Sequence, residues 1–498
     1  MRIDSLTLQN FRCFGPTPTT ISLGDITALV GANGAGKTAV LQAVVRLFGV
    51  PPSERGIQRS DFHATLDVDP DEVNEVALMI EARLAFPELA GPRAQPAAVP
   101  GHFQHMIVNQ PGGEPYCRVR LEATWTRGTL PEGDIEENVF WVTTSGTNVT
   151  DADKLRMRNP ERNRIHAVYV PASRDPSKRL RYVSGTLLGR ILRAIAWSEG
   201  AKQAVASASQ QMRASFDGEA GIGIIHQKVG EVWGLLHDAA IYANPRLRPI
   251  ADELEDVLKQ IELVFRPGED GAEHALERLS EGMRSLFYMA LVGSVVEIER
   301  EAVVGAVPGG NPPPFAADRL VPPDLTFLAM EEPENHLAPQ YLGRIMTLLK
   351  RLVATPAAQV ALTTHSPSIL RRVDPQAVRH LKLDPTTRAT IVREIRLPAA
   401  TDEAHKYVKE AVTAYPELYF ARLVVLGEGD SEEIVLPRIL KVGGARATAP
   451  RRRSSSRGTA TCSSARVSPA PIFALCFRYR TRTLLRTCLR SWGGSPRA

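Results

Sequence analysis

The sequence predicts an α/β fold, because three short apolar segments read as buried strands and each is followed by a glycine-rich or polar segment. The first strand, residues 26–30, runs into a glycine-rich loop and then into a helical pattern at 38–48. The second, residues 325–330, ends in Glu-Glu-Pro-Glu, and the third, residues 359–364, ends in His365. Buried strands that alternate with helical segments are typical of α/β architectures.

Residues 29–38 form a complete phosphate-binding loop between a strand and a helix. Its glycines, including Gly34 and Gly36, let successive backbone N–H groups such as that of Asn33 face the phosphates of a nucleotide. Lys37 supplies a positive charge to the β- and γ-phosphates, and Thr38 offers a hydroxyl to Mg²⁺. The helix N-terminus adds a partial positive charge at the same place. The loop therefore predicts binding of ATP with Mg²⁺.

Polar residues at the ends of the other two strands supply the rest of a hydrolytic site. Glu331 is placed to hold the Mg²⁺ water shell, and Glu332 to polarise the attacking water as general base. His365 is placed to contact the γ-phosphate and report its presence. Glu331 or Glu334 is the next candidate for the base. The alternatives are a solvated helix start for the glutamates and a structural role for the histidine.

Ser280 and Gly282 open an apolar helix at 286–296, which predicts a second anion-binding helix terminus, with a simple N-cap as the alternative. Lys37, Ser280, Glu332 and His365 follow one another at gaps of 243, 52 and 33 residues, in the order of ABC-type ATPases. In SMC- or ABC-type heads the terminus belongs to the partner subunit. The pattern therefore predicts a dimer that sandwiches the nucleotide.

Together these motifs resemble the OLD (overcoming lysogenization defect) family of ATP-dependent nucleases. The Glu-Glu-Pro-Glu form at 331–334, the Asn-Phe-Arg opening that ends in Arg12, the segments 170–175 and 182–185, and the Toprim-like start at 423–432 carry the likeness. The resemblance implies an ABC/SMC-type P-loop ATPase head with Arg12 near the phosphates. It also implies a helical dimerisation segment, a Toprim nuclease domain and DNA as partner.

We expect five segments: an N-terminal ATPase lobe at 1–180, a helical dimerisation segment at 181–268, a C-terminal ATPase lobe at 269–400, a partial Toprim domain at 415–440 and a basic, low-order tail at 441–498. The helical segment rests on helical apolar spacing. The residues with that spacing are Leu187, Leu188, Ile191, Leu192, Leu254, Val257, Leu258, Ile261 and Val264.

The tail has a composition unlike the rest of the chain. Residues 441–498 contain twelve Arg, one Lys and neither Asp nor Glu, so they carry +13, and the remaining 440 residues carry −8 of the total of +5. Three interpretations stay open: out-of-frame translation, which the break favours, a genuine arm that binds nucleic acid, and a segment on a membrane surface.

The tail bears on the nuclease, because Toprim sites hold divalent metal with an early Glu and a later pair of Asp. Glu428 and Glu432 are candidate metal ligands, but no carboxylate side chain follows Glu433. Asp430 has an additional interpretation as a helix N-cap in a capping box with Glu433. We expect an incomplete second metal site and no DNA cleavage by this chain.

Composition bounds the remaining possibilities. Hydrophobic residues make up 43% and charged residues 23%, as in globular domains. No signal peptide and no run of 18 apolar residues occurs, and Cys13 and Cys117 stand alone, so we expect no membrane partner and a cytoplasmic location. An SMC-like ATP-driven DNA clamp without nuclease is the alternative function, and a transporter ATPase is disfavoured. The sequence identifies no further protein partner, helicase-like or other.

Overall fold

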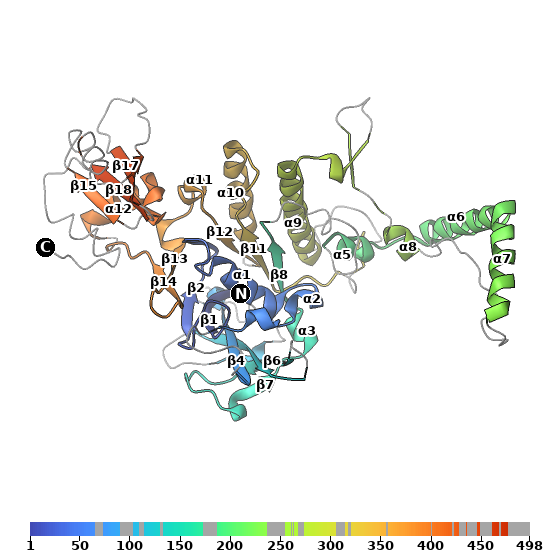
Figure 1. Cartoon of the computed structure of the whole chain (residues 1–498), viewed down its shortest axis with the longest axis horizontal. Coiled ribbons are helices and arrows are strands. Elements are labelled where there is room, and N and C mark those ends of the chain that lie inside the picture. Colours follow the sequence, from blue (N-terminus) through green and yellow to red (C-terminus); the bar gives the residue numbers. More distant parts are fainter. Residues whose placement is uncertain are drawn as a thin grey trace. The chain divides into compact units, whose positions relative to one another are not determined.

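The computed structural model divides the chain into two compact units (Figure 1). Unit 1 comprises Met1–Ala172 and Pro323–Ala498, and unit 2 comprises Ser173–Pro322. The inserted unit is therefore longer than the segment 181–268 expected from helical spacing, because it also contains the helix after Ser280. The described residues are 1–64, 73–89, 103–108, 114–129, 133–172, 187–236, 254–259, 261, 263–266, 273–304, 314–316, 320–354, 357–399, 401–420, 423–427, 435, 446–448, 461–467 and 470–476.

A six-stranded, mostly parallel sheet forms the centre of unit 1. Its strand order is β14-β13-β3-β12-β11-β8, and only β14 runs antiparallel to its neighbour. The strands are β14 (Thr390–Glu394), β13 (Val378–Leu383), β3 (Ile26–Gly31), β12 (Ala358–Thr363), β11 (Leu325–Glu331) and β8 (Ile165–Val170). Every residue of β12, and all but one in each of β3 and β11, is buried, as expected for parallel strands covered on both faces. The predicted α/β class is confirmed.

A second, antiparallel sheet has the order β2-β1-β4-β5-β6-β7. It contains β2 (Thr19–Ser22), β1 (Arg2–Gln9), β4 (Glu75–Ala85), β5 (Tyr116–Thr126), β6 (Asp134–Val142) and β7 (Lys154–Arg156). Gln359 on β12 joins the sheets: its amide donates to the carbonyls of Ile3 (2.7 Å) and Gly24 (3.0 Å), and its oxygen accepts from the N–H of Ile3 (2.9 Å). These bonds satisfy a fully buried polar side chain.

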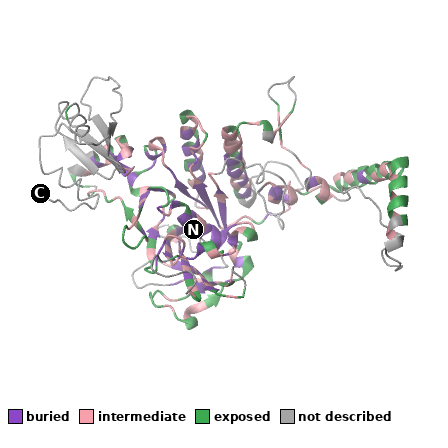
Figure 2. Cartoon of the chain, viewed as in Figure 1, coloured by how far each residue is buried: buried purple, intermediate pink, exposed green. Residues whose placement is uncertain are grey.

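Helix α1 (Lys37–Phe48) is the centre of the core in unit 1. All but two of its residues are buried, and its apolar side chains share one continuous cluster with those of both sheets, including Phe327 on β11 and Trp141 on β6 (Figure 2). A helix that is buried nearly all round is held by packing rather than by one amphipathic face. This packing fixes the start of α1, and with it the position of Lys37.

The other helices of unit 1 lie at its periphery. They are α2 (Pro52–Arg55), α3 (Asn159–Arg162), α10 (Pro339–Val353), α11 (Pro367–Leu370) and α12 (Glu403–Ala414). Helix α10 packs against β12 and α11, and the 3₁₀ helix η8 (Pro416–Phe420) packs against β3, α11 and α12. The segment after α12 is thereby brought to the strand that carries the phosphate-binding loop.

Unit 2 is mainly helical in its described residues. It contains α5 (Leu187–Ala194), α6 (Glu199–Asp217), α7 (Ala220–Leu236), α8 (Leu254–Lys259) and α9 (Glu281–Val304). Val264, expected to continue a helix, lies instead in the short strand β9 (Val264–Phe265), which pairs with β10 (His274–Ala275). Phe265 contacts Phe287 edge-to-face at 5.0 Å, a contact between aromatic rings that helical spacing does not reveal.

Three strands occur within the segment expected to be a low-order tail. They are β16 (Arg446–Thr448), β17 (Thr461–Val467) and β18 (Ala470–Cys476), and β18 pairs in parallel with β15 (Leu423–Gly427), the predicted first Toprim strand. No helix in the described ranges is long and apolar enough to cross a lipid bilayer.

Candidate functional site

The phosphate-binding loop turns sharply between β3 and α1, and glycine is required at two of its positions. Gly31 has φ +151°, and a Cβ there would lie 2.2 Å from the carbonyl oxygen of Leu381 on the adjacent strand β13. Gly36 caps α1 with φ +97°, and a Cβ there would lie 2.7 Å from Sγ of Cys13. A larger residue at either position would open the loop.

Lys37 is held at the base of this loop. Its Nζ donates to the carbonyl oxygens of Gly31 and Ala32, both at 3.0 Å, and only 7% of the residue is exposed. Burial lowers the pKa of Lys37, and three carboxylates, led by that of Glu332, oppose the shift. Thr38 and the loop residues Asn33 and Gly34 are exposed. The loop therefore has a solvent-exposed surface at Asn33, Gly34 and Thr38, and the Lys37 ammonium group is held against the carbonyls at its base.

The register of the central sheet brings the three predicted strand ends to one edge. Glu331 is paired with Thr363, and Thr363 with Leu29, so β11 and β12 end at the same level and β3 ends two residues further on, at Gly31. Because these strands are parallel, the segments that follow them lie at the same edge of the sheet. The structure thus brings Lys37, the glutamates after β11 and His365 together.

The three glutamates after β11 have different surroundings. Oε2 of Glu331 accepts from the backbone N–H of Ala172 at 3.4 Å, whereas its Oε1 is buried and forms no hydrogen bond with any described residue. Glu332 takes a strained φ of +40°, and its N–H donates to the carbonyl oxygen (3.0 Å) and the hydroxyl (3.1 Å) of Thr363. Asn335 donates to Oε2 of Glu332 at 2.9 Å, which orients the carboxylate.

Glu334 connects the loop after β11 to the loop after β12. Its Oε1 accepts from the hydroxyl of Thr364 at 2.8 Å and from the backbone N–H of His365 at 2.7 Å. Its Oε2 is buried without a hydrogen bond to a described residue. The sequence marks Glu334 only as a substitute base, because hydrogen bonds across 30 residues leave no signal in a single sequence.

His365 lies between Glu332 and an aromatic ring. Its Nε2 is 3.7 Å from Oε1 of Glu332 and forms no hydrogen bond to a described residue, and its ring stacks on Phe420 with centroids 6.0 Å apart and an interplanar angle of 26°. Burial lowers the pKa of His365, and the charge of Lys37 lowers it further, while the nearby carboxylates raise it. The imidazole is therefore neutral at neutral pH.

Arg12 points its guanidinium at a different partner from the one implied by the family resemblance. Its Nε donates to Oδ1 of Asp61 at 2.8 Å, and Arg46 donates to the other oxygen of Asp61 at 2.8 Å. Asp61 is fully buried, so both arginines are needed to compensate its charge. A contact of Arg12 with phosphates stays a prediction.

Ser280 and Gly282 belong to unit 2, at the start of α9. The hydroxyl of Ser280 accepts from the N–H of Met283 at 3.4 Å, so this residue acts as an N-cap, the simpler of the two interpretations. Its predicted contact with a nucleotide on a partner subunit stays a prediction. Glu428 and Glu432 lie outside the described residues.

The residues at the loop fit a magnesium ion bound with a nucleotide. Within the part of the chain that the structure describes, no group of three or more His, Cys, Asp or Glu side chains is arranged to hold a metal by itself. Mg²⁺ in nucleotide sites is usually held by one or two protein oxygens, phosphates and waters. The unpartnered Oε1 of Glu331 and the exposed hydroxyl of Thr38 match that requirement.

Comparison with known proteins finds ATPase domains in two parts of the chain. Residues 1–84 match the AAA ATPase domain family, and residues 238–371 match a family described as "AAA domain, putative AbiEii toxin, Type IV TA system". An OLD nuclease from Thermus scotoductus is 24% identical over 445 residues, which cover 86% of this chain and 72% of that protein.

Two solved structures of SMC heads are also similar. The SMC head domain from Thermotoga maritima has 16% identity, a TM-score of 0.34 and covers 80% of this chain and 100% of that one. The Smc head with an extended coiled coil from Pyrococcus furiosus, bound to the C-terminal domain of ScpA, has 12% identity, a TM-score of 0.39 and covers 84% and 99%. The two ATPase-domain matches and the OLD relative agree with the resemblance seen in the sequence: the chain contains segments similar to AAA-type ATPase domains and is similar over most of its length to an OLD nuclease.

Proposed function

We propose that this chain hydrolyses ATP with Mg²⁺ and that hydrolysis regulates a DNA-directed Toprim endonuclease. The observation that carries the proposal is that Lys37, Glu332 and His365 lie together at one edge of the central sheet. They are close enough that the charge of Glu332 acts on the pKa of Lys37, and the charge of Lys37 on the pKa of His365. These residues come from three strands that lie side by side but are far apart in the chain.

Binding of the nucleotide falls to the loop and its supports. The N–H groups of the loop and the N-terminus of α1 receive the phosphates, and Lys37 exchanges its bonds with the carbonyls of Gly31 and Ala32 for phosphate oxygens. Thr38 and Glu331 would hold Mg²⁺, which neutralises the charge of phosphate oxygens when bound. Glu331 Oε1 is buried without a hydrogen bond, so a bound Mg²⁺ would give it a partner and thereby add to the affinity for nucleotide with Mg²⁺.

Glu332 acts as general base in this proposal. Asn335 holds one oxygen of its carboxylate, and the other oxygen faces the neutral His365, so that a water between them can be oriented for attack. The neutral imidazole does not pair strongly with the carboxylate, which leaves Glu332 able to accept a proton. His365 offers its free Nε2 to the γ-phosphate.

Two variants test this assignment. Lys37→Ala should lose nucleotide binding, measured with a fluorescent ATP analogue, because the loop loses its only buried ammonium. Glu332→Gln should bind ATP and slow turnover by about 10² to 10³, the range for loss of a general base. Glu410→Gln, an exposed change on α12, is the matched control. Normal turnover in Glu332→Gln would move the role of base to Glu331 or Glu334.

We further propose that the active unit is a dimer formed through unit 2. Helix α7 exposes Ile224 (60%), Ile225 and Val229, which lie on neighbouring turns of the same helix. Exposed apolar side chains on one helix are best covered by a second copy of the same surface. Dimerisation would also bring a nucleotide bound to the partner subunit to Ser280.

The nuclease part of the proposal places metal ligands at Glu428 and Glu432. Two carboxylates do not complete a two-metal site, so we expect the chain to bind DNA without cutting it. The assay is conversion of supercoiled plasmid to the nicked form with Mg²⁺ or Mn²⁺. Nicking that is lost in Glu428→Ala would contradict this expectation, because it would require carboxylates from elsewhere.

A further inference from the structure

Helix α10 has one face that is basic and exposed. Residues on the opposite face are buried against the rest of unit 1: Leu342, Ile345, Met346, Leu349 and Leu352. The outward face carries Gln340, Arg344, Thr347 and Lys350, at spacings of three or four residues that place them in one row. The helix contains no Asp or Glu along its length. Its exposed charge is therefore entirely positive.

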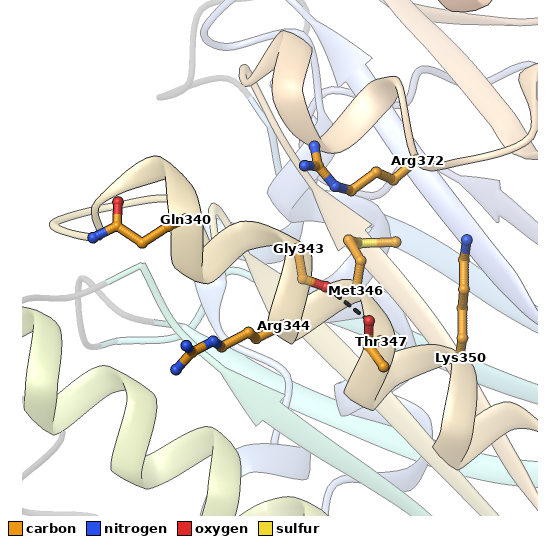
Figure 3. A pocket seen from close by; sticks show the side chains of 7 residues that line it. All are labelled: Gln340, Gly343, Arg344, Met346, Thr347, Lys350 and Arg372. Carbon is orange, nitrogen blue, oxygen red and sulfur yellow. Dashed lines mark hydrogen bonds between the residues drawn. The ribbon is translucent and has the colours of Figure 1, made fainter.

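A groove of about 590 Å³ lies between this row and Arg372, which follows α11. Figure 3 shows Arg372 reaching across the groove toward Gly343, while Lys350 extends from the helix further along. A Cβ on Gly343 would lie 3.7 Å from both Nε and Nη2 of Arg372, an ordinary contact distance, so the guanidinium lies close to the helix at this position. Arg372 also donates to the carbonyl oxygen of Ser368, which fixes its direction.

The three cations of the groove have no acidic partner among the described residues. Arg344 lies over the ring of Tyr341 at 5.7 Å, and no Asp or Glu in the described part of the chain forms an ion pair within 4 Å with Arg344, Lys350 or Arg372. The neighbouring Arg371, by contrast, pairs with Glu417 at 3.4 Å. Three uncompensated cations around one groove repel one another, and this repulsion is relieved by an anion that spans them.

We infer that this groove, defined by Gln340, Gly343, Arg344, Met346, Thr347, Lys350 and Arg372, binds the phosphate backbone of duplex DNA. Arg344 and Lys350 are six residues apart, roughly 9 Å along the helix axis, so the row can contact successive phosphates of one strand. Guanidinium and ammonium groups with free donors are the usual partners of phosphate.

The composition of the groove favours a duplex over a single strand. Single-stranded nucleic acids are held by stacking of bases on aromatic side chains, and no aromatic residue lines the groove. The inferred contacts are to phosphates, and contacts to the phosphate backbone carry no information about base sequence. Binding here should therefore be independent of sequence. The inference rests on the proposed role in DNA metabolism and specifies where the duplex is held.

The test is fluorescence anisotropy of a labelled 30-base-pair duplex, with the full chain, at several salt concentrations. The triple variant Arg344→Gln, Lys350→Gln, Arg372→Gln should lower the slope of log affinity against log salt by about 2 to 3, at about 0.9 per lost phosphate contact. Nucleotide binding should stay unchanged, since none of these residues is at the loop. A second triple variant at exposed positions on and just after β13 and β14, Lys382→Gln with Arg393→Gln and Arg396→Gln, removes the same number of positive charges and is the charge-matched control.

Each outcome decides between the alternatives. An unchanged slope in the triple variant, with normal DNA binding by the wild-type chain, overturns the groove but leaves the proposed function standing. Equal losses in the triple variant and the control also overturn it, because they reflect net charge alone. Competition by polyglutamate as strong as by duplex DNA would identify an acidic protein as ligand. Absence of DNA binding by the wild-type chain would overturn both this inference and the DNA part of the proposed function, while ATP hydrolysis would test the rest.

Discussion

Replacing Glu334 by Ala removes the connection between the two loops that carry Glu332 and His365. The carboxylate accepts two hydrogen bonds, from the hydroxyl of Thr364 and from the N–H of His365. Hydrogen bonds to a charged group contribute about 1.5–3 kcal/mol each. A factor of ten in an equilibrium corresponds to about 1.4 kcal/mol. At about 1.5 kcal/mol per bond, loss of one bond shifts the equilibrium between the placed and the displaced position of His365 about tenfold, and loss of both shifts it about a hundredfold.

We therefore expect ATP turnover by Glu334→Ala to fall by about 10- to 100-fold, while the affinity for ATP changes by less than about threefold. Steady-state ATP hydrolysis and binding of a fluorescent ATP analogue measure the two quantities separately. Thermal unfolding of each variant checks that the fold is retained. Turnover within about twofold of the wild-type rate would refute the reasoning, since His365 would then keep its position without the carboxylate.

Glu334→Gln separates a positioning role from a chemical one. The amide oxygen of Gln can accept the same two hydrogen bonds, so this variant should lose less than tenfold in turnover. If Glu334→Gln is as slow as Glu334→Ala, the charge of Glu334 is what matters. Glu334 would then be the general base or a metal ligand, and the assignment to Glu332 would have to be revised.

Three further predictions concern the pKa of a histidine, a buried ion pair and the dimer. Burial holds the pKa of His365 below its ordinary value, so Phe420→Ala, which uncovers the ring, should raise that pKa and move the acidic limb of the ATPase pH profile to higher pH, whereas Phe420→Tyr should not. Asp61→Ala leaves the buried Arg46 unpaired and should destabilise the fold by about 3–5 kcal/mol, against about 0–1 kcal/mol for the exposed Asp25→Ala, with denaturant unfolding as the measurement. Light scattering should report a dimer with ATP, and a chain that stays monomeric even when hydrolysis is blocked would exclude the apolar surface of α7 as an interface.

The lowered pKa of His365 also makes the free energy of unfolding depend on pH. The unfolded chain has the ordinary pKa of about 6.5, and the folded chain a lower one, so between these values the unfolded state binds more protons. This contribution to stability is therefore fully present above pH 6.5 and is lost as the pH falls toward the folded-state pKa. Unfolding free energies that rise on acidification through this window would contradict the burial of the ring.

The elements around the loop could be predicted from the sequence because each has a local signal. Apolar runs bounded by glycine or charged residues predicted the strands near 26–30, 325–330 and 359–364, and β3, β11 and β12 agree with them to within a residue or two. Strand β1 ends at Gln9, just before the Asn-Phe-Arg motif, because Asn10 and Arg12 both take positive φ.

Contacts within the site depend on tertiary structure and could not be predicted in the same way. The order β3-β12-β11 decides that His365 lies beside Glu332, and no single-sequence pattern encodes that order. The stacking of His365 on Phe420 joins residues 55 positions apart, and the ion pairs of Arg12 and Arg46 with the buried Asp61 join residues that are 49 and 15 positions apart. The extent of the inserted unit, 173–322, also follows from packing rather than from helical spacing.

The position of His365 suggests how nucleotide binding could alter the structure outside the ATPase site. The backbone N–H of His365 donates a hydrogen bond to Glu334, and the His365 ring lies against Phe420, the last residue of η8. Strand β15 begins at Leu423, so two residues of chain separate Phe420 from the first strand of the Toprim-like segment. A displacement of the His365 ring when its free Nε2 meets a phosphate has to be accommodated at Phe420, because packed rings do not deform independently. Strand β15 is the first element after Phe420 to which such a displacement can pass. Coupling of this kind requires Phe420 but does not require the exposed groove on α10.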